Sequence, residues 1–295
     1  MHGGHFTRSA NLIGKPDTTL IALQVAAALA EDLGAGDVTA ALVPASQQVR
    51  AQIIAREPAI LCGTDWVDAT FEQLDPSIRL EWVVRDGGRL AAGMPVLRLL
   101  GPARPLLTGE RTALNFLQTL SGTATAASRF VEAVVGTGCR ILDTRKTLPG
   151  LRLAQKYAVR CGGAQNLRMG LHDMVLIKEN HIIAAGSIAT AIATARKTAP
   201  GVTVEVEVET LDEFEQALDA GPDVIMLDEL SLSDMRIAVE RNRARGSKVK
   251  LEASGGVTLT TVRDIALTGV DYISIGSITK HVHAVDLSMR FEFVA

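Results

Sequence analysis

Five cationic side chains fall within one short stretch of this sequence, and several of them come directly after short apolar runs. They are Arg145, Lys146, Arg160, Arg168 and Lys178. The whole chain carries a net charge of −3, so these cations do not belong to a generally basic, nucleic-acid-binding surface. Cations gathered at strand ends suit the recognition of carboxylate or phosphate groups. The sequence therefore predicts a pocket for a small polyanionic molecule within residues 140–181.

Carboxylate side chains also lie near the ends of two later predicted strands. In the segment Val204–Val208, valine alternates with glutamate, which in a barrel directs Glu205 and Glu207 toward the lumen. We expect Glu207, near the mouth, to act at the site, and the deeper Glu205 to form a structural ion pair. Asp228 follows the next run, where it could either cap the following helix or, together with Glu207, hold ribose hydroxyls or Mg²⁺.

Two glycine-containing turns follow the last two predicted strands, at Ser254–Gly256 and at Ile275–Ser277. Backbone N–H groups in such turns can accept a phosphate group. The late loops of a barrel are its usual phosphate site, although an ordinary tight turn remains the alternative for each of them.

Strands and helices alternate regularly after residue 138, which predicts parallel strands joined by crossover helices. The expected helices lie near 151–161, 187–198, 211–220, 231–243 and 258–268. The expected strands are 140–143, 174–178, 204–208, 224–227, 250–253 and 272–275. Each strand ends in polar residues, and no Gly-x-Gly-x-x-Gly follows the first one. These features favour a barrel enzyme over an open nucleotide-binding sheet.

Residues 20–107 predict a small mixed domain, followed by a long helix over about 108–135. Its expected helices are 20–33 and 65–74, and its expected strands are 49–56, 59–61, 80–84 and 96–100. The long helix contains a run of small residues, 121–127, that suits close packing. Arg111 is expected in the first turn of this helix, where a cation opposes the helix dipole unless it is solvated or has an anionic partner.

Neither secretion nor a membrane is indicated by the sequence. The three cysteines form no Cys-x-x-Cys pair and fit a reducing cytoplasm. The apolar stretch Leu20–Ala30 is too short to cross a bilayer, and residues 1–19 contain no apolar signal region. We therefore expect a cytoplasmic protein without a membrane or nucleic-acid partner.

Several long motifs resemble quinolinate phosphoribosyltransferase, the carboxylating nicotinate-nucleotide pyrophosphorylase of NAD biosynthesis. They are Asp143–Gly150, Lys156–Tyr157, Gly162–Gly163, Leu176–His181, Glu205–Glu209 and Ser254–Gly256. The resemblance implies an α/β fold with three parts: an N-terminal α/β sandwich domain (1–115), an incomplete seven-stranded α/β barrel (116–276) and a C-terminal segment (277–295) packed on the N-terminal domain. It also implies a homodimer in which the subunits share their active sites.

The same resemblance implies the Mg²⁺-dependent reaction of quinolinate with phosphoribosyl pyrophosphate, which gives nicotinate mononucleotide, pyrophosphate and CO2. The side chains implied to hold the quinolinate carboxylates are Arg145, Arg168, Lys178 and, from the partner subunit, Arg111. Lys146 would lie between the two substrates. Glu207 and Asp228 would take the ribose hydroxyls and Mg²⁺. The residues implied for the 5′-phosphate are Ser254, Gly255 and Gly276.

One departure from the family pattern keeps other functions open. The family usually has Asn-His-Arg where this chain has Asn166-Leu167-Arg168, and leucine cannot donate a hydrogen bond. A non-catalytic or altered-specificity paralogue, of the type associated with molybdenum uptake, is therefore one alternative. A barrel lyase that forms a Schiff base through Lys178 is the other, although the neighbouring cations argue against it.

Overall fold

A computed structural model describes residues 15–293 of the chain, which divide into two compact units. Among the described residues, the first unit contains 15–125, 153–161 and 283–293, and the second contains 126–152 and 162–282. Residues 1–14, which make up most of the segment in which no signal region was predicted, lie outside the described residues. Within the described part, no helix is long and apolar enough to cross a membrane.

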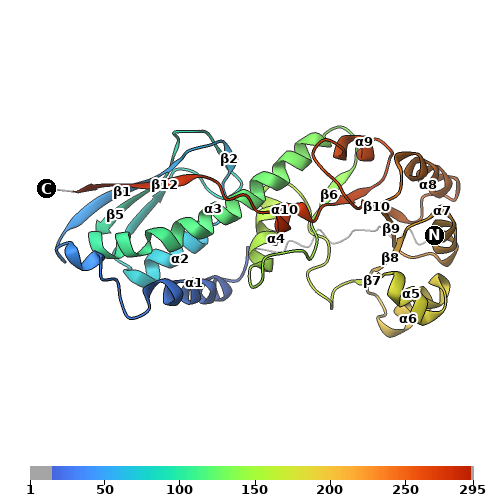
Figure 1. Ribbon diagram of the computed structural model, residues 1–295, viewed down its shortest axis with the longest axis horizontal. Coiled ribbons are helices and arrows are strands. Elements are labelled where there is room, and N and C mark those ends of the chain that lie inside the picture. Colours follow the sequence, from blue (N-terminus) through green and yellow to red (C-terminus); the bar gives the residue numbers. More distant parts are fainter. Residues whose placement is uncertain (1–14, 294–295) are drawn as a thin grey trace, which may run out of the picture. The chain divides into compact units, whose positions relative to one another are not determined.

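The first unit is built on an antiparallel sheet in the order β12-β1-β5-β3 (Figure 1). These strands are β12 (Leu287–Phe293), β1 (Gln48–Ala55), β5 (Pro95–Pro102) and β3 (Arg79–Trp82). Val49, Ala51 and Ile53 of β1 are buried, whereas the residues between them face the other way, as strand geometry requires. A second, two-stranded ladder pairs β2 (Ala59–Ile60) with β4 (Arg89–Leu90).

The helices of the first unit are α1 (Thr18–Leu33), α2 (Thr64–Leu74), α3 (Ala103–Ala133) and α4 (Arg152–Cys161), with a short 3-10 helix at Ala40–Leu42. Of these, α2 and α3 pack against one face of the antiparallel sheet. Phe71 of α2 and Leu106, Leu114 and Leu117 of α3 pack with the buried strand residues in one apolar core. The small residues of α3 permit the expected close packing, because a side chain at Gly122 would collide with the backbone of His283.

The second unit is built on a parallel sheet in the order β6-β11-β10-β9-β8-β7. These strands are β6 (Arg140–Leu142), β11 (Tyr272–Ser274), β10 (Lys250–Ser254), β9 (Val224–Asp228), β8 (Val204–Val208) and β7 (Val175–Ile177). Beyond β6, the chain at Gln165 adds an isolated parallel bridge to Leu142. Among the described residues β7 pairs only with β8, so the ladder stays open. The predicted open, barrel-like parallel sheet is confirmed, but among the described residues it has six strands and this bridge where seven strands were expected.

The helices of the second unit are α5 (Glu179–Ala185), α6 (Ile188–Thr198), α7 (Leu211–Ala220), α8 (Leu232–Ala244), α9 (Val262–Ala266) and α10 (Ser277–Lys280). Ser187, Thr210 and Ser231 cap three of them by accepting a backbone N–H three residues later. The helix expected over 258–268 is shorter because Thr258 and Thr261 hydrogen-bond each other and the local backbone. Four elements were not predicted from the sequence: α5, α10, β4 and β12.

Candidate active site

All six parallel strands end at one edge of the sheet in the second unit, which is where barrel folds build their active sites. Most of the predicted site residues lie at or just beyond that edge. They are Arg145, Lys146, Lys178, Glu207, Asp228, Ser254, Gly255 and Gly276. Arg168 follows the bridge at Gln165, and Arg111 belongs to the first unit.

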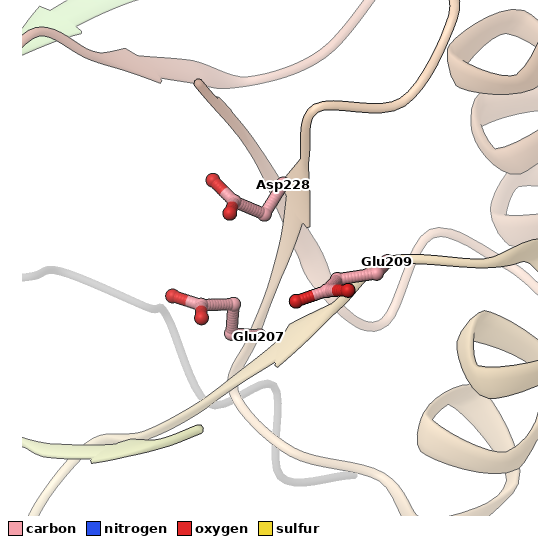
Figure 2. A group of neighbouring side chains, drawn as sticks. All are labelled: Glu207, Glu209 and Asp228. Carbon is pink, nitrogen blue, oxygen red and sulfur yellow. The ribbon is translucent and has the colours of Figure 1, made fainter. Parts of the chain in front are cut away.

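Three carboxylates gather at the ends of β8 and β9 (Figure 2). Glu207, Glu209 and Asp228 each offer an oxygen, and these oxygens all lie within 4.8 Å of one another. The register explains the cluster, because Val208 pairs with Leu227 and thus places Glu209 beside Asp228. Partial desolvation raises the pKa of Glu209, and the charges of its acidic neighbours raise it further. Carboxylate oxygens in this arrangement fit a hard cation such as Mg²⁺.

Glu209 was missed as a candidate metal ligand in the sequence analysis, which proposed only Glu207 and Asp228. It lies one residue beyond β8 and is exposed. The signal was present in the unbroken alternation of Glu205, Glu207 and Glu209, which directs all three toward the same side.

Lys178 forms an ion pair with Glu207, and its side chain is 47% exposed. The backbone N–H of Lys178 donates to Nδ1 of His181 at 3.0 Å, which fixes the turn between β7 and α5. Schiff-base lysines are activated by apolar burial or by a neighbouring cation. Lys178 is instead half exposed and paired with a carboxylate, so its environment does not favour the lyase alternative.

Two arginines add positive charge to the site beside Lys146 and Lys178. Burial lowers the pKa of Arg168, and the nearby charge of Arg145 lowers it further, while Glu205 and Asp173 act in the opposite direction. The Nε atom of Arg145 is buried without a hydrogen-bond partner among the described residues. A buried donor without a partner is costly, so this pair of guanidinium groups is suited to receive an anion.

Buried and turn-forming aspartates position Arg168. Asp143, which is fully buried after β6, accepts hydrogen bonds from Nδ2 of Asn166 at 2.7 Å and from the N–H of Leu167 at 2.8 Å. On the other side, Asp173 accepts the N–H groups of Met169 at 2.6 Å and Gly170 at 3.0 Å. Burial raises the pKa of Asp173, but these backbone hydrogen bonds outweigh it and leave that pKa below its usual value.

The Lys146 side chain lies against the turn before α10. A Cβ atom added at Gly276 would stand only 2.9 Å from Cδ of Lys146. The Lys146 backbone is held on both sides, because its N–H donates to Oγ1 of Thr144 at 3.1 Å and its carbonyl accepts from Oγ1 of Thr279 at 2.8 Å. The side chain itself is exposed and free to meet a ligand.

Gly255 lies in the turn after β10, in close contact with Glu229, the residue that follows β9. Its φ is +96°, and an added Cβ would stand 2.9 Å from the backbone nitrogen of Glu229. That nitrogen donates to the carbonyl of Ser254 at 3.0 Å, and Glu229 itself has a positive φ of 54°. Positive φ at a non-glycine residue costs free energy and is concentrated at functional sites.

Arg111 is exposed on α3, but its predicted place in the first turn is wrong. The helix starts at Ala103, because a proline at 105 is tolerated in a first turn. Thr108, the expected start, instead donates its hydroxyl to Oδ2 of Asp37 at 2.8 Å. Arg111 therefore lies too far from the start of α3 to oppose the helix dipole.

Paired arginines, a lysine–carboxylate ion pair and a carboxylate cluster thus meet at the carboxyl edge of a parallel, barrel-like sheet. This fold and this site together define a barrel-type enzyme whose substrates are polyanions.

Comparison with known families agrees with this class. Residues 37–121 match the N-terminal domain of quinolinate phosphoribosyl transferase, and residues 123–290 match its C-terminal domain. The chain therefore belongs to the quinolinate phosphoribosyltransferase family, and the family predicted from the sequence motifs is confirmed.

Relatives resemble the chain over nearly its whole length. The carboxylating nicotinate-nucleotide pyrophosphorylase of Mycobacterium leprae is 42% identical over 89% of this chain and 94% of its own. The solved nicotinate-nucleotide pyrophosphorylase of Francisella tularensis is 46% identical, with a TM-score of 0.90 over 95% of this chain and 99% of that one. The NadC structure from Streptococcus pyogenes is 38% identical, with a TM-score of 0.91 over 96% and 100%.

Proposed function

We propose that this chain transfers the phosphoribosyl group of phosphoribosyl pyrophosphate to quinolinate and releases CO2, which yields nicotinate mononucleotide and pyrophosphate for NAD biosynthesis. Besides family membership, the observation that carries this proposal is the guanidinium pair of Arg145 and Arg168. One of its buried donors has no partner among residues 15–293.

Quinolinate fits these cations because it carries two carboxylates on adjacent ring carbons. Arg145 and Arg168 would hold one or both of them through charge-assisted hydrogen bonds, which are stronger than neutral ones. Lys178 would contribute a third cation once its ion pair with Glu207 opens toward the substrate. Nicotinate lacks the second carboxylate and would leave part of this charge unpaired.

The carboxylate cluster suits the phosphoribosyl donor. Glu207, Glu209 and Asp228 would hold Mg²⁺, which when bound supplies positive charge to phosphate oxygens of the donor. Glu207 and Asp228 would also accept hydrogen bonds from ribose hydroxyls and stabilise positive charge that develops on the ribose. Ser254, Gly255 and Gly276 would receive the 5′-phosphate, and the exposed Lys146 would lie between the two substrates.

The reaction then follows from charge. The pyridine nitrogen forms a bond to the ribose C1′ while the bond from C1′ to pyrophosphate breaks and pyrophosphate leaves with the electron pair. The ring nitrogen becomes cationic, so the ring can accept the electron pair left behind when the adjacent carboxylate departs as CO2. A proton then adds to that ring carbon. The arginines and lysines at the strand ends would offset the negative charge of the bound anions. The carboxylates would offset the positive charge that develops on the ribose.

The first test is a product assay with Mg²⁺ and phosphoribosyl pyrophosphate. We expect nicotinate mononucleotide and pyrophosphate from quinolinate and neither product from nicotinate. Equal turnover of nicotinate would contradict a dicarboxylate pocket. Tight quinolinate binding without any product would favour the non-catalytic alternative that Leu167 left open.

The proposal includes a cytoplasmic homodimer whose subunits share active sites. Arg111 is exposed on α3 and would reach the quinolinate of the partner, whereas Lys178 ends a strand of its own barrel. Arg111→Ala and Lys178→Ala homodimers should each be nearly inactive. A mixed dimer places both lesions in one site, so its other site should work and restore about half of the activity per dimer. No recovery in verified mixed dimers would show that Arg111 acts within its own subunit.

A further inference from the structure

Along one face of the antiparallel sheet in the first unit, the side chains are exposed or half-buried. Two cross-strand rows of side chains project from it, and we call these eight residues the outer face. In strand order β12-β1-β5-β3 the first row is Glu292, Arg50, Leu100 and Arg79, and the second is Arg290, Gln52, Arg98 and Glu81. All eight line one shallow hollow of about 570 Å³.

Charges alternate at the four corners of the outer face. On β12 the corners are Glu292 and Arg290, and on β3 they are Arg79 and Glu81, so like charges lie diagonally. Seven of the eight residues are exposed, and Gln52 is half-buried. Arg98 pairs with Glu81 at 3.2 Å, but among residues 15–293 no ion pair is formed by Arg50, Arg79 or Arg290.

This alternating pattern is complementary to itself. A twofold axis in the plane of the sheet and parallel to its strands places β12 of one copy over β3 of the other. Each corner glutamate then faces a corner arginine, while Arg50 faces Leu100 and Arg98 faces Gln52. An axis across the strands exchanges the two rows and again opposes every corner glutamate to an arginine. No like charges meet in either case.

A partner of uniform charge is not complementary to all four corners. An acidic surface would face the two corner glutamates, and a basic surface would face the two corner arginines. Contacts about a twofold axis use the same patch on both subunits, which is the commonest form of protein assembly. Charge complementarity of this kind selects a partner and its orientation more than it adds affinity.

We propose that the outer face binds the outer face of a second copy of this chain, with Glu81 and Glu292 paired to arginines at positions 79 and 290 of that copy. The contact is separate from the proposed shared active site, which uses Arg111 on α3. The two contacts together would join dimers into larger assemblies. Four short strands form a small interface, so the association should depend on concentration and weaken with salt.

Two double variants test the charge pattern. Arg79→Glu with Arg290→Glu makes all four corners acidic, and Glu81→Arg with Glu292→Arg makes all four basic. Sedimentation velocity over a concentration series should show that each double variant sediments as a smaller particle than the wild type, without the association of dimers at high concentration. An equal mixture of the two should regain the wild-type mass, because acidic corners then face basic ones.

A matched control reverses charge elsewhere. Lys197→Glu with Arg236→Glu changes two exposed cations on α6 and α8 and should leave the assembly mass unchanged. Thermal unfolding of every variant verifies that it is folded. The proposal is overturned if wild type and both double variants have the same mass at all concentrations, or if the folded variants do not recover that mass when mixed.

Discussion

The carboxyl edge of the parallel sheet and the outer face of the antiparallel sheet use the same residue types in opposite ways. At the carboxyl edge, Arg145 and Arg168 are half-buried, and burial lowers the pKa of Arg168. On the outer face, Arg98 is exposed and pairs with Glu81 in water. A desolvated cation needs an anion to offset its lost hydration, whereas a solvated one does not. Burial therefore distinguishes the arginines that we propose to bind the substrate from those of the outer face, where sequence alone does not.

The largest expected effect is a difference in activity loss between an arginine of the carboxyl edge and one of the outer face. Arg168→Ala should leave a bound carboxylate unpaired, which costs about 2–5 kcal/mol. This corresponds to a loss in kcat/KM for quinolinate of roughly 30- to 4,000-fold. Arg98→Ala, the control from the outer face, breaks an exposed pair worth about 0–1 kcal/mol and should leave kcat/KM nearly unchanged. A similar loss of kcat/KM in both variants would show that the two arginines do not differ in this way.

Glycines at the carboxyl edge offer a second comparison. Gly255→Ala combines a strained positive φ with a collision against Glu229, so we expect a loss of roughly 2–4 kcal/mol in the free energy of unfolding. Gly256 also has a positive φ, of 55°, but an added Cβ would meet nothing within 4 Å. Gly256→Ala should cost only about 1–2 kcal/mol. Urea unfolding of both variants measures the difference, and equal costs would mean that the turn relaxes.

A third prediction concerns Leu167, whose backbone N–H is fixed on Asp143 beside Arg168. Leu167→His adds a donor at this position without moving the loop. If that donor reaches a quinolinate carboxylate, affinity should rise by about 1.5–3 kcal/mol, the value of a hydrogen bond to a charged group. Calorimetric titration with quinolinate measures this change. Unaltered or weaker binding would show that the pocket is already satisfied.

The smallest expected effect is a pH dependence. The pKa of Asp173 is lowered in the folded protein, so its stabilising contribution is fully present above its ordinary pKa of 3.8 and is lost as the pH falls through the lowered value. Asp173→Asn should therefore destabilise the protein more at pH 7 than at pH 3. The same sign holds for Asp75 in the first unit.

Asp75→Asn is thus a matched control for the site. With either substitution, the free energy of unfolding should fall less steeply as the pH is lowered. Only Asp173→Asn should also raise the KM for quinolinate, because Asp173 shapes the turn that follows Arg168. A raised KM in the Asp75 variant would indicate a general loss of structure instead.

Much of the second unit was predictable because its strands and helices carry strong periodic signals. In a parallel sheet the carboxyl ends of all strands lie at one edge, so the polar residues that follow the strands were expected to lie close together there. The roles of Asp143, Asp173 and Glu209 were missed because they depend on side-chain contacts with backbone N–H groups or on one residue of register. Such contacts have no periodicity. Arg111 was misplaced because Pro105 does not stop a helix in its first turn.

The composition of the two units has a consequence for how this protein can be divided. Residues 153–161 and 283–293 belong to the first unit, although they are separated from it in sequence by parts of the second. The matched family domains meet between residues 121 and 123, inside the continuous helix α3. A gene cut there would leave β12 without its neighbour β1. A single crossover at that point therefore cannot exchange either unit intact.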